Sequence, residues 1–214
     1  MSCLCGYKVC NLHTSLNKAV FRCFKSKVAK TVARPHKPGL GEMLFFLGSG
    51  AIVSIPMALF FEPSTEFLSN FFPAFQAEVL AVAVLAPIIE EFAKAYPLFY
   101  RHGENQKSLF TLGFLVGLGF GVTEFFAYVL LLGVPFEVRL PGIFFHAALT
   151  SIVAYGIASR RSTLYYLVAV FSHFSVNLIV ILKWPGLLYA LILGSVYALC
   201  FILYTRTSER MIDY

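Results

Sequence analysis

The chain is a succession of long apolar stretches separated by short polar connections. A helix needs roughly 20 apolar residues to cross about 30 Å of hydrocarbon, and stretches of that length recur along the sequence. The pattern predicts six membrane spans, at about 43–60, 74–100, 108–132, 142–159, 163–183 and 186–204. Gly, Pro and charged residues mark the connections, among them Glu62-Pro63, 133–135 and Arg160-Arg161. The expected fold class is an all-α, polytopic membrane helix bundle with about six transmembrane helices.

Composition agrees with a membrane protein. Hydrophobic residues make up 58% of the 214 positions and charged residues only 13%, whereas a soluble domain is about 45 to 50% apolar. The net charge of +6 follows the predicted topology and indicates no nucleic-acid partner. The partner that the composition does indicate is the lipid bilayer.

The distribution of Lys and Arg predicts the orientation. With a cytoplasmic amino terminus, only Arg139 and Lys183 fall in outside connections and Lys94 falls within a span. Positive charge gathers on the cytoplasmic side of membrane proteins, so both termini are expected there, in a multi-pass protein of the cell membrane. The basic residues placed inside are Lys8, Lys18, Arg22, Lys25, Lys27, Lys30, Arg34, Lys37, Arg101, Lys107, Arg160, Arg161, Arg206 and Arg210.

Three parts are expected: a basic cytoplasmic segment at 1–40, the membrane bundle at 41–205 and a short cytoplasmic tail at 206–214. The first segment has apolar residues at near-helical spacing and no acidic residue before Glu42. This pattern predicts an amphipathic helix on an anionic membrane surface, with a flexible tail or a transit peptide as alternatives. Cys3, Cys5 and Cys10 match no standard zinc spacing well, so free thiols are expected.

Ionisable residues lie inside the apolar runs, namely Glu90, Glu91, Glu124, His146 and His173. Each costs at least about 2.5 kcal/mol at bilayer depth unless a partner, a cavity or a metal compensates it. Counting about 1.5 Å per residue from the cytoplasmic end of each span puts them at one level, between the midplane and the outer leaflet. Residues with unrelated roles would not need to agree in depth, so we expect one site that water reaches from outside.

Local spacing adds detail. Lys94 follows Glu91 by three residues and Glu90 by four, so it can neutralise one carboxylate and leave the other for chemistry. Pro87 removes a backbone hydrogen bond and can bend the helix just before them. His173 and Asn177 are one turn apart and share a helix face. A row of small residues that allows close helix packing precedes Glu124: Gly113, Gly117, Gly119 and Gly121.

These glutamates, Lys94, the histidines and Asn177, in this order along the chain, resemble the motifs of the PrsW family of intramembrane proteases. That family is similar in turn to the CAAX prenyl endopeptidases and to bacteriocin-processing membrane proteases. The resemblance covers roughly residues 75–185. The prenyl endopeptidases usually have Arg after the paired Glu and His in the second motif, whereas this chain has Lys94 and Glu124, which favours PrsW. The residues that carry it are Glu90-Glu91-x-x-Lys94, Phe120-Gly121-Val122-Thr123-Glu124, His146 and His173-x-x-x-Asn177.

The resemblance implies hydrolysis of peptide bonds in membrane-anchored proteins or peptides. The residues permit it, because His146, His173 and Glu124 supply two nitrogens and one oxygen, a ligand set suited to a catalytic zinc with an open position for water. Glu90 is then the general base and proton shuttle, and Glu91 is the partner of Lys94. Asn177 is expected to donate to the oxyanion.

Other interpretations remain open on the sequence alone. Glu90 with His146 or His173 could activate water without a metal, and the roles of Glu90 and Glu91 could be exchanged. The same buried cluster would also serve a proton- or ion-coupled transporter or channel, although no inverted repeat is evident. A receptor or chaperone that has kept only the scaffold is a third class.

Overall fold

The structure is a computed structural model that describes residues 37–100, 105–209 and 212. Within these residues every regular element is helical, so the all-α class is confirmed. The predicted amphipathic segment, with Cys3, Cys5 and Cys10, falls on residues 1–36 and lies outside the described part of the chain.

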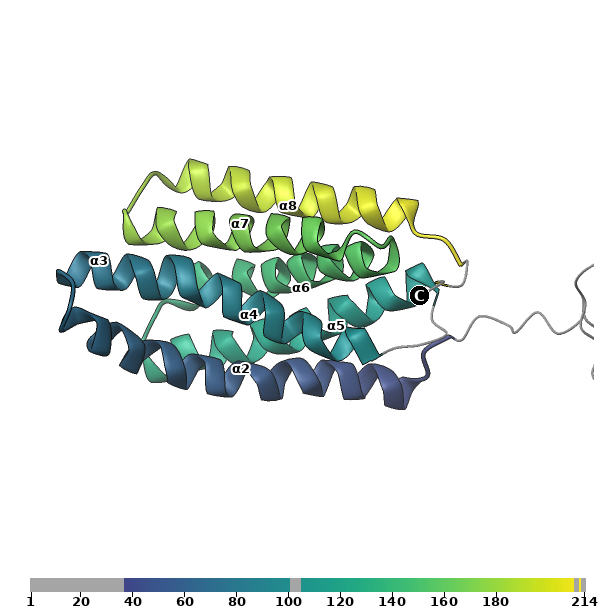
Figure 1. The fold of residues 1–214 in the computed structure, drawn as a ribbon, viewed down its shortest axis with the longest axis horizontal. Helices are drawn as coiled ribbons and strands as arrows, with labels where there is room; N and C mark the ends of the chain where they lie inside the picture. The colour runs from purple at the N-terminus through teal and green to yellow at the C-terminus, as the bar shows by residue number, and fades with distance from the viewer. Residues whose placement is uncertain (1–36, 101–104, 210–211, 213–214) are drawn as a thin grey trace, which may run out of the picture. The chain divides into compact units, whose positions relative to one another are not determined.

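The helices follow one another in alternating directions, joined by short connections (Figure 1). The segment at 74–100 is composite, because it contains the π-helix η1 and ends in the 3-10 helix η2. The elements are α2 (Leu40–Ser69), α3 (Ala74–Glu78), η1 (Val79–Leu85), α4 (Ala86–Ala95), η2 (Tyr96–Tyr100), α5 (Gln106–Phe126), the π-helix η3 (Ala127–Leu131), α6 (Phe136–Ala158), α7 (Ser162–Ile181) and α8 (Gly186–Arg206).

Four helical segments of the described residues are long and apolar enough to cross a membrane, namely 106–131, 136–158, 162–181 and 186–206. Helix α2 adds a shorter apolar part, Leu40–Pro56. The segment at 74–100 was also predicted to span, but it is divided among α3, η1, α4 and η2 and carries charged residues in its second half. These helices support a multi-pass membrane protein.

Two predicted boundaries are wrong, both at prolines. Helix α2 continues through Glu62-Pro63, which the pattern assigned to a connection, and ends at Ser69. Helix α6 begins at Phe136 and contains Pro141, whereas the span was expected from about 142. A proline removes one backbone hydrogen bond but does not by itself force a helix to end, because the other hydrogen bonds of the surrounding turns remain.

Close packing of α5 fixes the positions of the neighbouring backbones. A Cβ added to Gly117 would collide with the backbone of His146 and Ala147, and one on Gly119 with the carbonyl oxygen of Leu47 on α2. The glycine row therefore allows α5 to lie against α6 on one side and α2 on the other, as small residues do in membrane helices. Most of α6 is buried as a result.

Candidate active site

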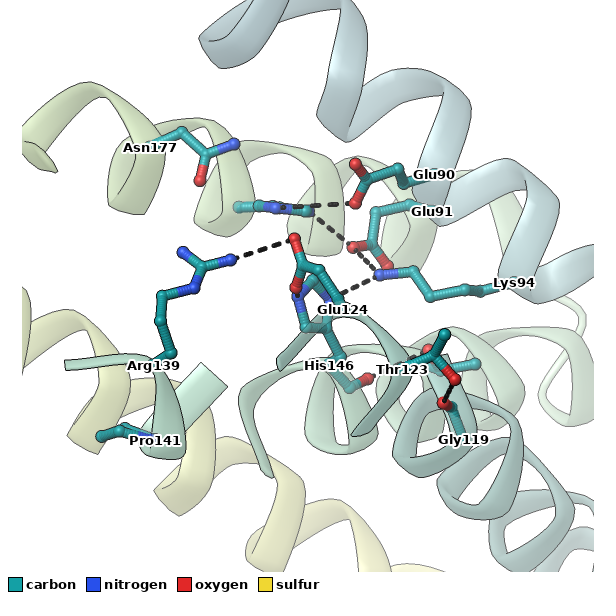
Figure 2. A network of polar contacts seen from close by, with 12 residues as sticks. Glu90, Glu91, Lys94, Gly119, Thr123, Glu124, Arg139, Pro141, His146 and Asn177 are labelled. Carbon is teal, nitrogen blue, oxygen red and sulfur yellow. Dashed lines mark hydrogen bonds and ion pairs between the residues drawn. The ribbon is translucent and has the colours of Figure 1, made fainter. Parts of the chain in front are cut away.

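The ionisable residues of the predicted spans come together inside the helix bundle (Figure 2). Five of them are buried, each with at most 7% of its surface exposed: Glu90, Glu91, Lys94, His146 and His173. The cluster draws on four helices: Glu90, Glu91 and Lys94 on α4, Glu124 on α5, Arg139 and His146 on α6, and His173 and Asn177 on α7.

Glu91 is held by two partners. Its Oε1 lies 2.6 Å from Nζ of Lys94, and the same oxygen lies 2.9 Å from Nδ1 of His173. The ion pair expected from the three-residue spacing of Glu91 and Lys94 is thus present. Because a carboxylate only accepts, His173 donates through Nδ1, and the lone pair of its neutral ring is on Nε2. Glu91 therefore orients His173.

The second imidazole has both nitrogens engaged. Lys94 Nζ lies 2.9 Å from Nδ1 of His146, and Glu124 Oε2 lies 2.6 Å from its Nε2. An ammonium group has no lone pair, so Lys94 donates to Nδ1 and the neutral ring donates from Nε2 to Glu124. Lys94 thus links the two histidines, because it contacts both His146 and the carboxylate that orients His173.

Arg139 completes the chain of charges. One of its guanidinium nitrogens lies 3.2 Å from Glu124 Oε1, and its carbon Cζ lies 3.5 Å above the ring centroid of Tyr128. Glu124 is therefore bound on both oxygens, by Arg139 and by His146. The guanidinium is fixed by an ion pair and a cation–π contact together.

Glu90 differs from the other carboxylates of the cluster. Its Oε2, like Oε2 of Glu91, is buried without a hydrogen-bond partner among the described residues, but Glu90 lines a cavity of the bundle and Glu91 does not. Nε2 of His173 lies 3.9 Å from Glu90 Oε2. Both atoms are acceptors, and their separation leaves room for a water molecule that would donate to each. The pair is thus the part of the cluster whose unused acceptors lie at the cavity.

A cavity of about 930 Å³ contains this pair. It extends along α7 and η1 to the end of the bundle where the 132–135 and 182–185 connections lie, since Val134, Lys183 and Trp184 are among its lining residues. Glu90, Glu124, His146, His173 and Asn177 line its inner part. The volume falls in the range of pockets that bind small molecules or short peptide segments.

The sequence between residues 39 and 205 matches the PrsW family of intramembrane metalloproteases. The chain belongs to this family. The match includes every residue of the polar cluster and confirms the resemblance inferred from the motifs of α4 to α7. The chain matches no curated protein and no solved structure. Membership supports an intramembrane protease, in agreement with the apolar helices of this multi-pass protein.

The donor set of this PrsW-family chain fits a metal ion, with one difference from the expected ligands. Glu90, His146 and His173 each offer a ligand atom, and these atoms lie within 4.8 Å of one another. The sequence interpretation gave the carboxylate position to Glu124, but Glu124 is paired with His146 and Arg139 and does not belong to this group. Two histidines and a glutamate are the ligands of one class of catalytic zinc sites.

Two features of the PrsW-family site were not predicted. Arg139 was treated only as an outside charge, although it precedes His146 by seven residues, two helical turns, and so shares a face with it. Asn177 donates from Nδ2 to the carbonyl oxygen of Val82 on η1, at 2.8 Å, a contact that the sequence did not predict, and it also lines the cavity. The sequence held a signal for the first feature in its helical spacing.

Proposed function

We propose that this chain is an endopeptidase that hydrolyses peptide bonds of membrane-associated polypeptides within the cavity, at a level between the midplane and the outer leaflet. The observation that carries the proposal is the pair formed by Glu90 Oε2 and His173 Nε2, two acceptors 3.9 Å apart in a cavity that reaches the end of the bundle. Family membership supports the protease class.

Glu90 and His173 bind and activate the water. A water between them would donate one hydrogen to each, which directs its lone pairs toward the cavity. Glu90 then takes a proton as general base and returns it to the leaving amine. His173 remains in the required tautomer because Glu91 accepts its Nδ1 hydrogen, the arrangement by which a carboxylate orients a catalytic imidazole.

Asn177 is the donor that we propose for the developing negative charge. Its amide nitrogen carries two hydrogens, of which Val82 takes one, and its side chain belongs to the lining of the cavity. Preorganised donors of this kind commonly supply the largest part of the catalysis of acyl transfer.

Zinc is the metal that we propose for the site, held by Glu90, His146 and His173. In the metal-bound form Glu90 and His173 would be ligands of the ion, and the pair would bind water directly only in the metal-free form. When bound, it would act as a Lewis acid that activates water and polarises a carbonyl. His173 already has the oriented, carboxylate-bound geometry of a metal-ligating imidazole. For His146 to bind the metal through Nε2, the Nε2 proton would have to pass to Glu124, and Lys94, which donates to Nδ1, would stabilise the deprotonated ring.

Metal content of the purified protein tests this assignment independently of activity. Elemental mass spectrometry is expected to find zinc in the wild type and to find it lost in His146→Ala, His173→Ala and Glu90→Gln. Glu124→Gln is the matched control, because it removes the charge of a cavity carboxylate outside the ligand group, and it is expected to retain the metal.

Two results would change the assignment. If Glu124→Gln loses zinc while Glu90→Gln keeps it, the carboxylate ligand is Glu124 and Glu90 is a base only. An active wild type purified without any metal contradicts the zinc proposal and leaves Glu90 and His173 as a metal-free pair.

A further inference from the structure

The helix that carries the paired glutamates is irregular one turn before them. Residues Val79–Leu85 form the π-helix η1, and α4 follows with Pro87 in its first turn. The N–H of Ala86 donates to the carbonyl of Ala81, five residues back. The backbone is therefore in the π register where it reaches the proline.

This register leaves the carbonyl of Val82 without a regular donor. In an α-helix the N–H of Ala86 would bond to it, but that N–H is used by Ala81. In the π register the donor would be residue 87, and a proline has no N–H. A carbonyl without a partner at membrane depth is costly, so it requires a donor from elsewhere in the protein.

Asn177 is that donor. Its Nδ2 lies 2.8 Å from the oxygen of Val82, a contact between residues 95 positions apart in the sequence. Glu90 lies three residues after Pro87, and His173 lies four residues before Asn177. The hydrogen bond is thus about two turns from Glu90, which follows Val82 by eight residues, and one turn from His173.

We propose that Asn177, besides the oxyanion contact proposed for its second amide hydrogen, has a positioning role: it replaces the N–H removed by Pro87 and thereby fixes η1 and α4 against α7. The distance between Glu90 Oε2 and His173 Nε2, 3.9 Å, depends on how these helices lie together. Pro87 and Asn177 then act as one unit. The proline leaves the carbonyl of Val82 without a backbone donor, and the amide of Asn177 binds that carbonyl and so aligns Glu90 with His173. The effect on catalysis rests on the proposed peptidase function.

A double-mutant cycle tests the unit, because Pro87→Ala supplies a new backbone N–H. Asn177→Ala alone is expected to lower the rate of hydrolysis of a single-span membrane peptide that carries a fluorophore and a quencher, in detergent, by about 10-fold, the effect of leaving a buried carbonyl without its donor. The double variant Pro87→Ala/Asn177→Ala should hydrolyse the substrate at least about three times faster than Asn177→Ala, since the N–H of residue 87 can then bond to the carbonyl of Val82. A double variant no more active than Asn177→Ala would overturn the proposal.

Thermal unfolding in detergent gives a second readout that does not need activity. Asn177→Ala should lower the unfolding midpoint by about 4 °C in the wild-type background and by much less in the Pro87→Ala background. Equal shifts of the midpoint in both backgrounds would refute the joint role of Pro87 and Asn177, whether or not the wild type is active. A wild type that cleaves nothing would count only against the peptidase function.

Pro141 provides the matched control. It lies inside α6, so Pro141→Ala also adds an N–H to a membrane helix, but one directed to a different carbonyl. The proposal requires that Pro141→Ala restore neither the rate nor the midpoint of Asn177→Ala. Equal rescue by both prolines would show general helix stabilisation and would contradict the specific role of Val82.

Discussion

Glu90 and Glu91 are adjacent in the sequence but have different surroundings. Glu91 Oε1 accepts from Lys94 and from His173. Oε2 of both glutamates lacks a hydrogen bond from the described residues, but of the two only Glu90 lines the cavity. The Glu91 carboxylate forms an ion pair with Lys94 and orients the imidazole of His173. The Glu90 carboxylate has the free acceptor at the cavity that water activation requires.

Replacing Glu91 is expected to destabilise the protein. Lys94 is fully buried, and Glu91→Gln would leave its charge without the carboxylate, a change that costs about 3 to 5 kcal/mol when a buried pair is broken. Unfolding in denaturant, followed by tryptophan fluorescence, measures this loss.

The double variant Glu91→Gln/Lys94→Met is its control, because removing both charges should restore most of the lost free energy of unfolding. A Glu91→Gln protein as stable as the wild type would contradict the structural role assigned to this ion pair.

Arg139 is expected to affect turnover more than stability. Its side chain is 26% exposed, so losing it leaves no fully buried gap, but Glu124 would then be free to move away from His146. Arg139→Gln should lower kcat by about 10-fold, an effect of order 1.4 kcal/mol, with Arg139→Lys less affected. A changed unfolding midpoint with unchanged kcat would show that the pair serves folding only.

At the level of the helices, Gly117 places His146. A Cβ at this position would collide with the backbone of His146 and Ala147, and backbone cannot move aside as a flexible side chain can. Gly117→Ala is therefore expected to separate α5 from α6, to cost about 1 to 3 kcal/mol and to lower activity. Gly194→Ala on α8 is the control, since no atom lies within 4 Å of its added Cβ.

The measurement is turnover and unfolding of both glycine variants side by side. A Gly117→Ala protein with wild-type turnover would mean that the contact between α5 and α6 does not set the position of His146.

The helices were largely predictable, because long apolar runs determine them almost alone. Contacts within one helix were predictable too, as the spacing of Glu91 and Lys94 shows. Contacts between helices were not, because they depend on how each helix is rotated about its axis. The interaction of Glu124 with Arg139 and that of Asn177 with Val82 are of this second kind, and both changed the interpretation of the site.

For the whole molecule, we predict that both termini face the cytosol and that the cavity opens on the outside. The prediction rests on the distribution of Lys and Arg. Single cysteines in place of Asn70 and Arg161, in a background without other cysteines, should be labelled from opposite sides by an impermeant maleimide. Arg161 is chosen because Arg160 has a positive φ of 57°, where a substitution adds strain. Labelling of both from one side would refute the topology.

The most direct test of the account is cleavage by the purified protein in proteoliposomes. Single-span membrane peptides that carry a fluorophore and a quencher on opposite sides of the membrane segment are incubated with the wild type and with Glu90→Gln. We predict cleavage by the wild type, within or beside the outer half of the segment, and a rate at least about 10² to 10⁴ times lower for a folded Glu90→Gln protein. Equal cleavage by both proteins, or no cleavage by the wild type over a broad set of peptides, would contradict the proposal that Glu90 serves an intramembrane peptidase.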